Sequence, residues 1–294
     1  MLGESVLDYW VVDVFADNAF AGNPLAVVLD ADALSTAQMQ AVAREFNLSE
    51  TTFPVRTTTA DANYLLRIFT PTAELPFAGH PSVGTAWLMQ SLGRVEPGRV
   101  VQECGAGLLP LQVDADGATL TGGEPVVSDA VDPAPLLAAV GLEANDFAGT
   151  EPRWAGTGIN WAFLHVTDEA VARAVPDLGK LKELSAGGPN RTGVAVLAWQ
   201  DGRAHARVFA GGFGVSEDPA TGSAALGMGV WLVAAGLVAA DGDSSYEIAQ
   251  GLEMGRPSRL VCTVTAADGR AVACRVSGKV APVAHGQIAV PTPR

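Results

Sequence analysis

The sequence predicts an α+β fold built from two similar halves. A short motif occurs twice: Arg-Ile-Phe at 67–69 is matched by Arg-Val-Phe at 207–209, and Pro-x-x-Gly-Thr-Ala at 81–86 by Pro-x-x-Gly-Ser-Ala at 219–224. The copies lie 138 to 140 residues apart, about half of the 294-residue chain. Each copy leads into an apolar stretch typical of a buried helix, among short runs typical of strands. We therefore expect two α+β domains facing each other across a cleft, where small molecules commonly bind.

In the first half, strands and one amphipathic helix precede the repeated motif. Strands are expected at 9–15 and 25–29, on either side of a Gly-Asn-Pro turn. A helix is expected over 35–46, because Ser35 and Gln38 can form a capping box and apolar residues follow at helical spacing. The other expected elements are a strand at 63–69, a buried helix at 81–92 and strands at 100–102, 108–113 and 118–121.

The second half repeats this plan after a candidate linker at 122–132, which carries Gly, Pro and Asp. The predicted domains are therefore residues 1–124 and 125–294, with the last strand able to cross back to the first half. The expected elements are a strand at 160–166, a helix within 167–184, strands at 193–199 and 204–209, and a long helix after Pro219. Residues 224–240 carry no charge, but three glycines and the lack of Lys or Arg anchors favour a buried helix over a membrane span.

Composition narrows the class of protein. Apolar residues make up 48% of the chain, which excludes disorder as a description of the whole. The net charge of −14 argues against nucleic-acid and anionic-membrane partners. Three cysteines in no metal-ligand spacing, and an N-terminus without the basic start of a signal peptide, favour a reducing cytoplasm. No pair of histidines has metal-binding spacing, so no metal is predicted.

The residues just before the two repeated prolines are the first candidates for chemistry. If helices begin at Pro81 and Pro219, His80 and Asp218 stand at their N-termini, where free N–H groups and the helix dipole favour an anion. Two facing helix N-termini could hold a small carboxylic acid in this acidic protein. The alternatives are an ordinary interior histidine for His80 and a simple N-cap for Asp218.

A proton-transfer site also needs a base. Glu45 lies on the amphipathic helix and is expected to face solvent, whereas Glu50 follows the helix stop at Asn47. From local sequence alone, Glu50 could equally be a surface carboxylate in a turn. Ser223 lies in Thr-Gly-Ser-Ala, which does not fit the nucleophile turn of a serine hydrolase. Structural roles are expected for His165, His205 and His285.

Six motifs, in order along nearly the whole chain, carry a family resemblance. They are Gly-Asn-Pro-Leu-Ala-Val-Val at 22–28, Asn-Leu-Ser-Glu-Thr-Thr-Phe at 47–53, Arg-Ile-Phe-Thr-Pro at 67–71, Glu-Leu-Pro-Phe-Ala-Gly-His-Pro at 74–81, Glu-Asp-Pro-Ala-Thr-Gly-Ser-Ala at 217–224 and Gln-Gly-Leu-Glu-Met-Gly-Arg-Pro-Ser at 250–258. Together they resemble the PhzF family of phenazine-biosynthesis isomerases. The resemblance implies a diaminopimelate epimerase-like fold: two pseudo-symmetric domains, each a curled, mostly antiparallel sheet around a central helix, with the active site between them.

The resemblance also implies a homodimer that needs no cofactor. The family's reaction is the isomerisation of trans-2,3-dihydro-3-hydroxyanthranilate by proton transfer in phenazine biosynthesis, so the expected substrate is a small cyclic amino or hydroxy acid. Two other functions stay open: an amino-acid epimerase or racemase, and a small-acid binding protein without turnover. The related epimerases use two cysteines as acid and base, but Cys104, Cys262 and Cys274 lie outside the matching motifs, which disfavours a two-thiol racemase.

Site roles follow motif by motif from the same resemblance. Glu50 matches the family's proton shuttle, and His80 and Asp218 match residues that position and polarise the substrate. The expected carboxylate-binding groups are Ser223 and the N–H groups at Gly79 and Gly222.

Overall fold

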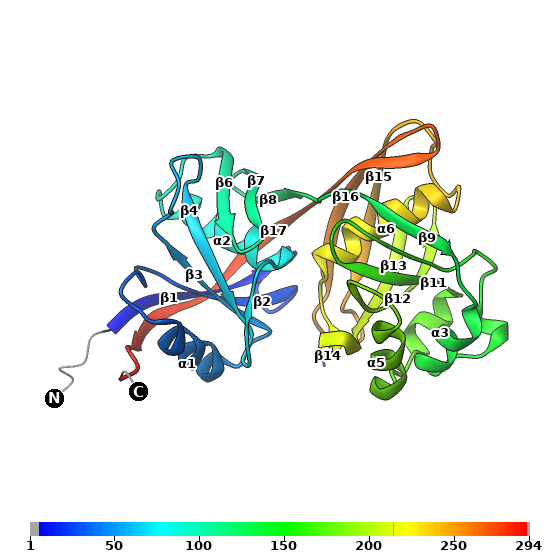
Figure 1. Cartoon of the computed structure of the whole chain (residues 1–294), viewed down its shortest axis with the longest axis horizontal. Coiled ribbons are helices and arrows are strands. Elements are labelled where there is room, and N and C mark those ends of the chain that lie inside the picture. Colours follow the sequence, from blue (N-terminus) through cyan, green and yellow to red (C-terminus); the bar gives the residue numbers. More distant parts are fainter. Residues whose placement is uncertain (1–5, 214, 293–294) are drawn as a thin grey trace. The chain divides into compact units, whose positions relative to one another are not determined.

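The computed structural model describes residues 6–213 and 215–292, and the chain divides into two compact units (Figure 1). Unit 1 consists of Met1–Leu120 and Ser277–Arg294, and unit 2 of Thr121–Val276. The chain therefore passes from unit 1 to unit 2 after Leu120 and returns within its last strand, β17 (Arg270–Ala289).

The strands of unit 1 form a closed sheet, in which the last strand pairs with the first. Its other strands are β1 (Val6–Val14), β2 (Asn23–Val28), β3 (Glu50–Val55), β4 (Tyr64–Phe69), β5 (Glu74–Leu75), β6 (Gly98–Cys104), β7 (Gly107–Val113) and β8 (Gly117–Thr121). Neighbouring strands pair in the order β1, β2, β3, β4, β6, β7, β8 and β17, and β17 pairs again with β1. Only β2–β3 and β4–β6 are parallel among the pairs whose register is known.

The core of unit 1 is helix α2 (Gly79–Ser91), which contacts β1, β2, β3, β6 and β7. Ten of its thirteen residues are buried, so the helix has no solvent-facing side, as the sequence predicted. Close packing depends on Gly84, where a Cβ atom would lie 2.6 Å from Val14 Cγ2 and 2.8 Å from Leu25 Cδ2. The indole of Trp87 donates a hydrogen bond to the carbonyl of Ala115, so its buried N–H is satisfied.

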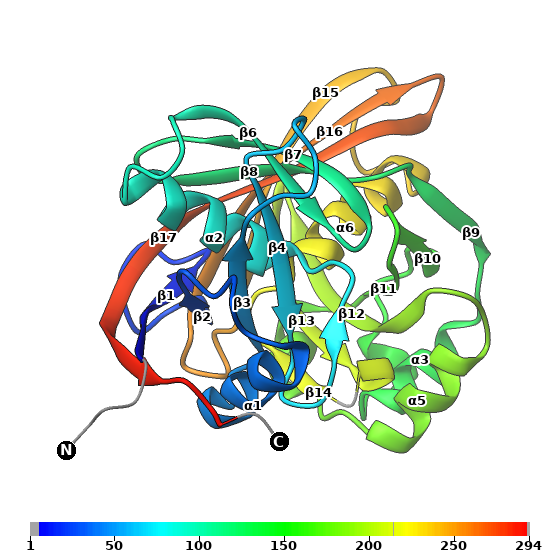
Figure 2. The same ribbon diagram turned by 60° about the vertical axis from the view of Figure 1, so that its left-hand side comes forward.

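Helix α1 (Thr36–Phe46) lies on the outside of the same strands, beside β3 and β4 (Figure 2). The predicted capping box is confirmed: Gln38 N–H donates to Ser35 Oγ and Ser35 N–H donates to Gln38 Oε1. Asn47 ends the helix in the left-handed conformation, as the sequence indicated. Glu45 is exposed, also as predicted.

Unit 2 has one mixed sheet with helices on both faces. Its strands are β9 (Val126–Ala130), β10 (Arg153–Gly156), β11 (Asn160–His165), β12 (Arg191–Gln200), β13 (Arg203–Ala210), β14 (Val215–Asp218), β15 (Gly242–Gln250) and β16 (Ser258–Ala267). The helices α3 (Pro133–Ala139), α4 (Asp168–Arg173) and α5 (Leu178–Ala186) pack on β11, β12 and β13. A cluster of buried side chains, including Leu137, Leu164 and Leu181, fills that interface.

Helix α6 (Gly222–Ala234) is the second buried helix, with contacts to β9, β10, β11 and β16. Eleven of its thirteen residues are buried, which confirms a core helix at this apolar stretch. Gly227 permits the approach, because a Cβ there would lie 2.8 Å from the main-chain oxygen of Ala155. Trp231 donates its indole N–H to the carbonyl of Glu151. Across the described residues, no helix is long and apolar enough to cross a membrane.

Both buried helices are found where they were predicted, but neither begins at its repeated proline. Helix α2 begins two residues before Pro81, which is tolerated because first-turn N–H groups have no partner inside the helix. Helix α6 begins three residues after Pro219, with Thr221 as the N-cap. The chain stays non-helical there because Ser258 and Gln250 donate to the carbonyls of Pro219 and Asp218.

Two other expectations are also corrected. The candidate linker at 122–132 contains β9, which pairs antiparallel with β10. None of the five residues of β9 is buried, so this strand lacks the alternation that marks strands in a sequence. The single helix expected within 167–184 is two helices, α4 and α5, separated by a segment that contains Pro176.

Candidate functional site

In unit 1, the structure brings Glu50 and His80 together. Glu50 is the first residue of β3, aligned with Leu25 of the parallel strand β2, and His80 is the second residue of α2. Glu50 Oε2 lies 3.5 Å from His80 Nε2. Only 17% of the Glu50 side chain and 7% of the His80 side chain are exposed, so Glu50 is not the surface carboxylate that local sequence allowed.

Burial sets the electrostatics of Glu50. Removal from water raises the pKa of this carboxyl, and a hydrogen bond from Ser49 opposes the increase in pKa. Ser49 Oγ also lies 3.3 Å from Oδ1 of the fully buried Asn23. Within the described part of the chain, Glu50 Oε2 accepts no hydrogen bond. The titratable group beside this oxygen is the His80 ring, whose Nε2 lies 3.5 Å away.

A polar network behind the N-terminus of α2 was not predicted from the sequence. The fully buried Gln102 of β6 donates through Nε2 to Ser82 Oγ at 2.9 Å. Ser82 Oγ in turn donates to the carbonyl of Ala78, the N-cap residue, at 2.8 Å. Tyr64 OH donates to Gln102 Oε1 at 3.3 Å. The network fixes the first turn of the helix that carries Gly79 and His80.

In unit 2, Asp218 is the last residue of β14 rather than the residue before a helix. Thr221 Oγ1 donates to Asp218 Oδ2 at 2.5 Å. Gln250, the last residue of β15, donates through Nε2 to the main-chain oxygen of Asp218 at 2.7 Å and to Thr221 Oγ1 at 3.0 Å. The preceding residue, Glu217, pairs with both Nε and Nη2 of Arg207. Asp218 is therefore held by its neighbours on both sides.

Gly222 and Ser223, the predicted carboxylate-binding residues of unit 2, are the first two residues of α6. Ser223 Oγ accepts a hydrogen bond from the indole of Trp161, so its own hydrogen can be donated elsewhere. Within the described residues, the N-cap residues Ala78 of α2 and Thr221 of α6 make no side-chain capping hydrogen bond, and neither helix has an acidic residue in its first turn. These two helix ends are therefore suited to an anion.

All three cysteines are buried and free of disulfide bonds. Cys104 is buried and donates to the carbonyl of Gly107. Burial raises the pKa of Cys274 to about 12 and holds the pKa of Cys262 far above its usual range. A Cβ on Gly229, two turns into α6, would lie 3.5 Å from Cys274 Sγ. With pKa values this high, Cys262 and Cys274 are not suited to acid–base catalysis.

Two of the other three histidines, His205 and His165, have polar side-chain partners. The ring nitrogens of His205 lie 2.8 Å from Asp168 and 2.9 Å from Glu253. His165 Nδ1 lies 2.8 Å from Thr150 Oγ1, and burial lowers the pKa of this histidine. Within the described residues, no group of three or more His, Cys, Asp or Glu side chains could hold a metal ion.

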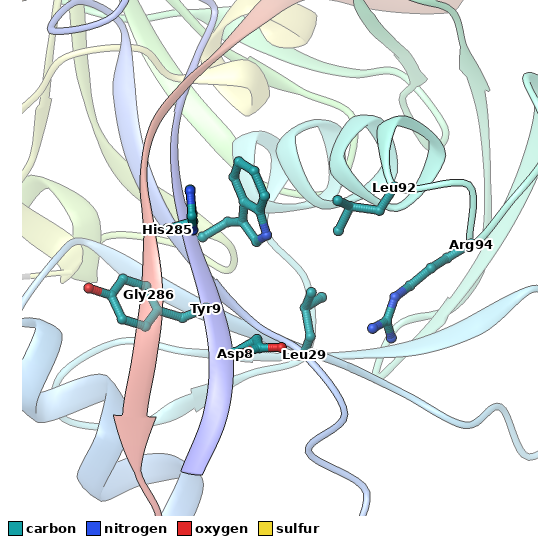
Figure 3. A pocket seen from close by; sticks show the side chains of 8 residues that line it. Asp8, Tyr9, Leu29, Leu92, Arg94, His285 and Gly286 are labelled. Carbon is teal, nitrogen blue, oxygen red and sulfur yellow. The ribbon is translucent and has the colours of Figure 1, made fainter.

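A pocket of about 370 Å³ in unit 1 lies at the other end of α2. Its lining residues are Asp8, Tyr9, Trp10, Leu29, Leu92, Arg94, His285 and Gly286 (Figure 3). Leu92 caps the C-terminus of α2, about 18 Å along the helix axis from His80 at 1.5 Å per residue. The Arg94 guanidinium already pairs with both carboxylate oxygens of Asp30. None of the predicted site residues lines this pocket.

Comparison with known proteins identifies first the class of fold. The chain superimposes on a PhzF-family phenazine biosynthesis protein of Bacillus anthracis with a TM-score of 0.87, covering 97% of this chain and 99% of that one at 24% identity. A Pseudomonas aeruginosa protein described as a predicted epimerase is 34% identical, with a TM-score of 0.77 over 96% of this chain and 99% of its own. The fold is therefore that of PhzF proteins and related epimerases.

The chain belongs to the PhzC-PhzF family of phenazine biosynthesis-like proteins, whose profile matches residues 12–286. The trans-2,3-dihydro-3-hydroxyanthranilate isomerase of Pseudomonas aeruginosa is 36% identical over 285 residues, which cover 95% of this chain and 98% of that enzyme. The family resemblance read from the motifs is confirmed, and the protein is an isomerase with a small-molecule substrate.

Proposed function

We propose that this isomerase moves a proton between two carbons of a small cyclic amino or hydroxy acid without a cofactor. The observation that carries the proposal is the environment of Glu50. Its carboxyl is largely buried beside His80, and burial raises the pKa of this carboxyl. A general base works best when its pKa lies near the operating pH, and desolvation shifts a glutamate in that direction. A related enzyme named for trans-2,3-dihydro-3-hydroxyanthranilate makes that compound the first substrate to test.

The proton balance needs only Glu50. Its ionised carboxylate takes a proton from one substrate carbon, and the electron pair left behind shifts into the conjugated system. The carboxylic acid then returns the proton to a second carbon, which regenerates the carboxylate. Such a positioned acid–base group contributes about 10²- to 10⁴-fold in rate.

The other site residues bind and orient the substrate. His80 and Asp218 polarise its amino and hydroxyl groups, and the N–H groups of Gly79 and Gly222 with the hydroxyl of Ser223 bind its carboxylate. The uncapped N-termini of α2 and α6 support this assignment. The proposal includes two pseudo-symmetric units. A homodimer and a cytoplasmic location also stay predictions.

The test is proton NMR of trans-2,3-dihydro-3-hydroxyanthranilate in D₂O with the wild-type protein, Glu50→Gln and Asp218→Asn. We expect conversion by the wild type, and a loss of at least about 10²-fold in Glu50→Gln. Deuterium enters at the second carbon in those turnovers in which the Glu50 carboxyl exchanges its proton with solvent before returning it. Glu45→Gln is the matched control, because Glu45 is an exposed glutamate on α1 only five residues away. Full activity in Glu50→Gln would remove Glu50 from the mechanism.

A second candidate is an amino-acid epimerase, favoured by the relative described as a predicted epimerase. The same deuterium experiment on a panel of proline-like and other amino acids distinguishes the two. Exchange confined to the α-carbon, with loss of optical purity and no movement of a double bond, identifies an epimerase. Tight binding of small acids with no exchange identifies a binding protein without turnover.

A further inference from the structure

Gln250 belongs to the motif at 250–258, to which the proposed chemistry assigns no role. This residue is 2% exposed and lies at the C-terminal end of β15. The register of β15 fixes its position from two sides, because Gln250 is aligned with Ala206 of β13 and with Ser258 of β16. Gln250 is therefore a rigidly placed amide directly beside the segment that carries Asp218.

The backbone determines the orientation of this amide. The N–H of Thr221 can only donate, and it lies 3.2 Å from Gln250 Oε1. The main-chain oxygen of Asp218 can only accept, and it lies 2.7 Å from Gln250 Nε2. Both amide ends are thus assigned without ambiguity, which is unusual for a glutamine side chain.

The orientation of Gln250 in turn sets the direction of the Thr221 hydroxyl. Gln250 Nε2 donates to Thr221 Oγ1, so this oxygen acts as an acceptor on that side. Its single hydrogen is then available for Asp218 Oδ2, at 2.5 Å. The Thr221 hydroxyl does not cap α6, although Thr221 is the N-cap residue. Its hydrogen bond is therefore directed to the carboxylate rather than to the helix.

The backbone on both sides of Asp218 is anchored as well. Ser258 Oγ donates to the carbonyl of Pro219 at 2.8 Å. Gly251 has φ +74°, and a Cβ there would lie 2.6 Å from the Pro219 oxygen, so this turn packs directly on the segment. On the other side, Arg207 holds Glu217 through two hydrogen bonds of 2.8 and 2.7 Å.

We propose that Gln250 is a positioning residue of the proposed active site, which fixes the Asp218 carboxylate through the Thr221 hydroxyl. The proposal rests on the proposed function, since it assumes that Asp218 contacts the substrate. Catalysis is sensitive to this kind of support, because a displacement of about 1 Å in a positioning group can cost about 10²-fold in rate.

The decisive comparison is Thr221→Val against Thr221→Ser. Valine keeps the shape of threonine but cannot donate to Asp218, whereas serine keeps the hydroxyl. We expect kcat to fall about 10- to 100-fold in Thr221→Val and in Gln250→Leu, and to stay within about threefold of wild type in Thr221→Ser. Gln250→Glu keeps the acceptor for Thr221 N–H but loses both donated hydrogen bonds, so it tests the same point if Gln250→Leu does not fold.

Tyr246→Phe is the control for an effect through stability alone. It removes a buried hydrogen bond to the carbonyl of Ala225 in α6, but it does not touch Asp218. We expect a lower unfolding temperature with kcat unchanged. The proposal is overturned if Thr221→Val and Gln250→Leu keep the same kcat as Tyr246→Phe when all three variants have lost the same amount of stability.

Two further measurements separate this proposal from the proposed function. If Asp218→Asn retains full kcat/KM, the role of Asp218 in the proposed function is wrong. The positioning proposal is then tested by the ¹³C shift of the Asp218 carboxyl, which should move in Thr221→Val and not in Thr221→Ser. An unmoved shift overturns the positioning proposal whether or not a substrate has been found.

Discussion

Arg67 and Arg207 begin the two copies of the repeated motif, and each makes the same contacts to one phenylalanine and one glutamate. Each guanidinium lies over the phenylalanine two residues later, at 5.2 and 5.1 Å from the ring centre. Each donates from Nε at 2.8 Å and from Nη2 at 2.7 Å to the two carboxylate oxygens of a glutamate, Glu74 in unit 1 and Glu217 in unit 2. The same corner thus precedes α2 and α6.

The two corners differ in burial and in what else they hold. The side chains of Arg67 and Glu74 are 21% and 38% exposed, against 9% and 13% for Arg207 and Glu217. Arg207 also donates to the carbonyl of Ala174, at the C-terminus of α4, at 2.8 Å. One local motif therefore serves as a surface ion pair in unit 1 and as an anchor in the interior of unit 2.

The two buried glutamines show the same relation. Gln102 and Gln250 each lie on the first strand after a buried helix, parallel to the strand that carries the repeated arginine. Each donates to a hydroxyl at the N-terminus of that helix. In unit 1 that hydroxyl donates to the main-chain carbonyl of Ala78, and in unit 2 it donates to the carboxylate of Asp218. Similar scaffolds can thus support different side-chain chemistry.

The largest expected difference concerns the two arginines. Arg207→Met leaves the largely buried carboxylate of Glu217 without this partner, which typically costs about 3–5 kcal/mol of unfolding free energy. Arg67→Met removes a partly exposed pair and should cost about 1 kcal/mol or less. Urea unfolding of both variants measures these losses. Equal losses of unfolding free energy would show that the two ion pairs do not differ in their contribution to stability. Glu217→Gln and Glu74→Gln remove the charge of the glutamate in each pair and serve as matched variants.

A smaller difference is expected at the glycines that let the buried helices approach their strands. At Gly227 a new Cβ meets a backbone oxygen, which cannot rotate away, whereas at Gly84 it meets the methyl ends of two side chains. Overpacking costs about 1–3 kcal/mol. We expect Gly227→Ala near the upper end of this range and Gly84→Ala near the lower end, as measured by thermal and urea unfolding. The opposite order would show that α2 is the more tightly packed helix.

Elements with a strong local pattern were predicted well from the sequence. The helix that begins after Ser35 has a capping box and a one-sided apolar pattern, and the two buried helices are uncharged apart from His80 and mostly apolar. Their starting residues were missed, because proline in the first turn is compatible with several starts and tertiary hydrogen bonds decide among them. For Asp218, those hydrogen bonds come from Gln250, 32 residues later.

The candidate site was likewise predicted from the sequence only where the local sequence carried a signal. Residue types at the helix N-termini and the motif at 47–53 indicated Glu50, His80 and Asp218, but no local feature placed Glu50 beside His80. That proximity follows from the parallel pairing of β2 and β3 and from the packing of α2 on both strands. Gln102 and Gln250 gave no local signal, because a glutamine in a strand is ordinary until its burial is known.

The smallest expected effect is a difference between Glu50 and Asp218 in how each carboxylate makes the unfolding free energy depend on pH. Burial raises the pKa of Glu50, so ionisation disfavours the folded state. Below the usual glutamate pKa of about 4.3 the carboxyl is neutral in both states, and no cost arises. As the pH rises, the unfolded chain loses its proton first and stability falls. Glu50→Gln carries no charge, so we expect it to be about 0.5–2 kcal/mol more stable than wild type near pH 8, with the gap closing near pH 4.

Asp218→Asn is the counterpart in unit 2. Its carboxylate accepts the Thr221 hydroxyl, and a neutral amide accepts more weakly, so this change should bring no gain in stability near pH 8. Urea unfolding of wild type and both variants from pH 4 to pH 8 measures the contrast. A Glu50→Gln gain that does not vary with pH would contradict the raised pKa, because only a group that titrates differently in the two states makes the gap depend on pH. An equal gain in Asp218→Asn would show that the hydrogen bonds around Asp218 do not compensate for burying its charge.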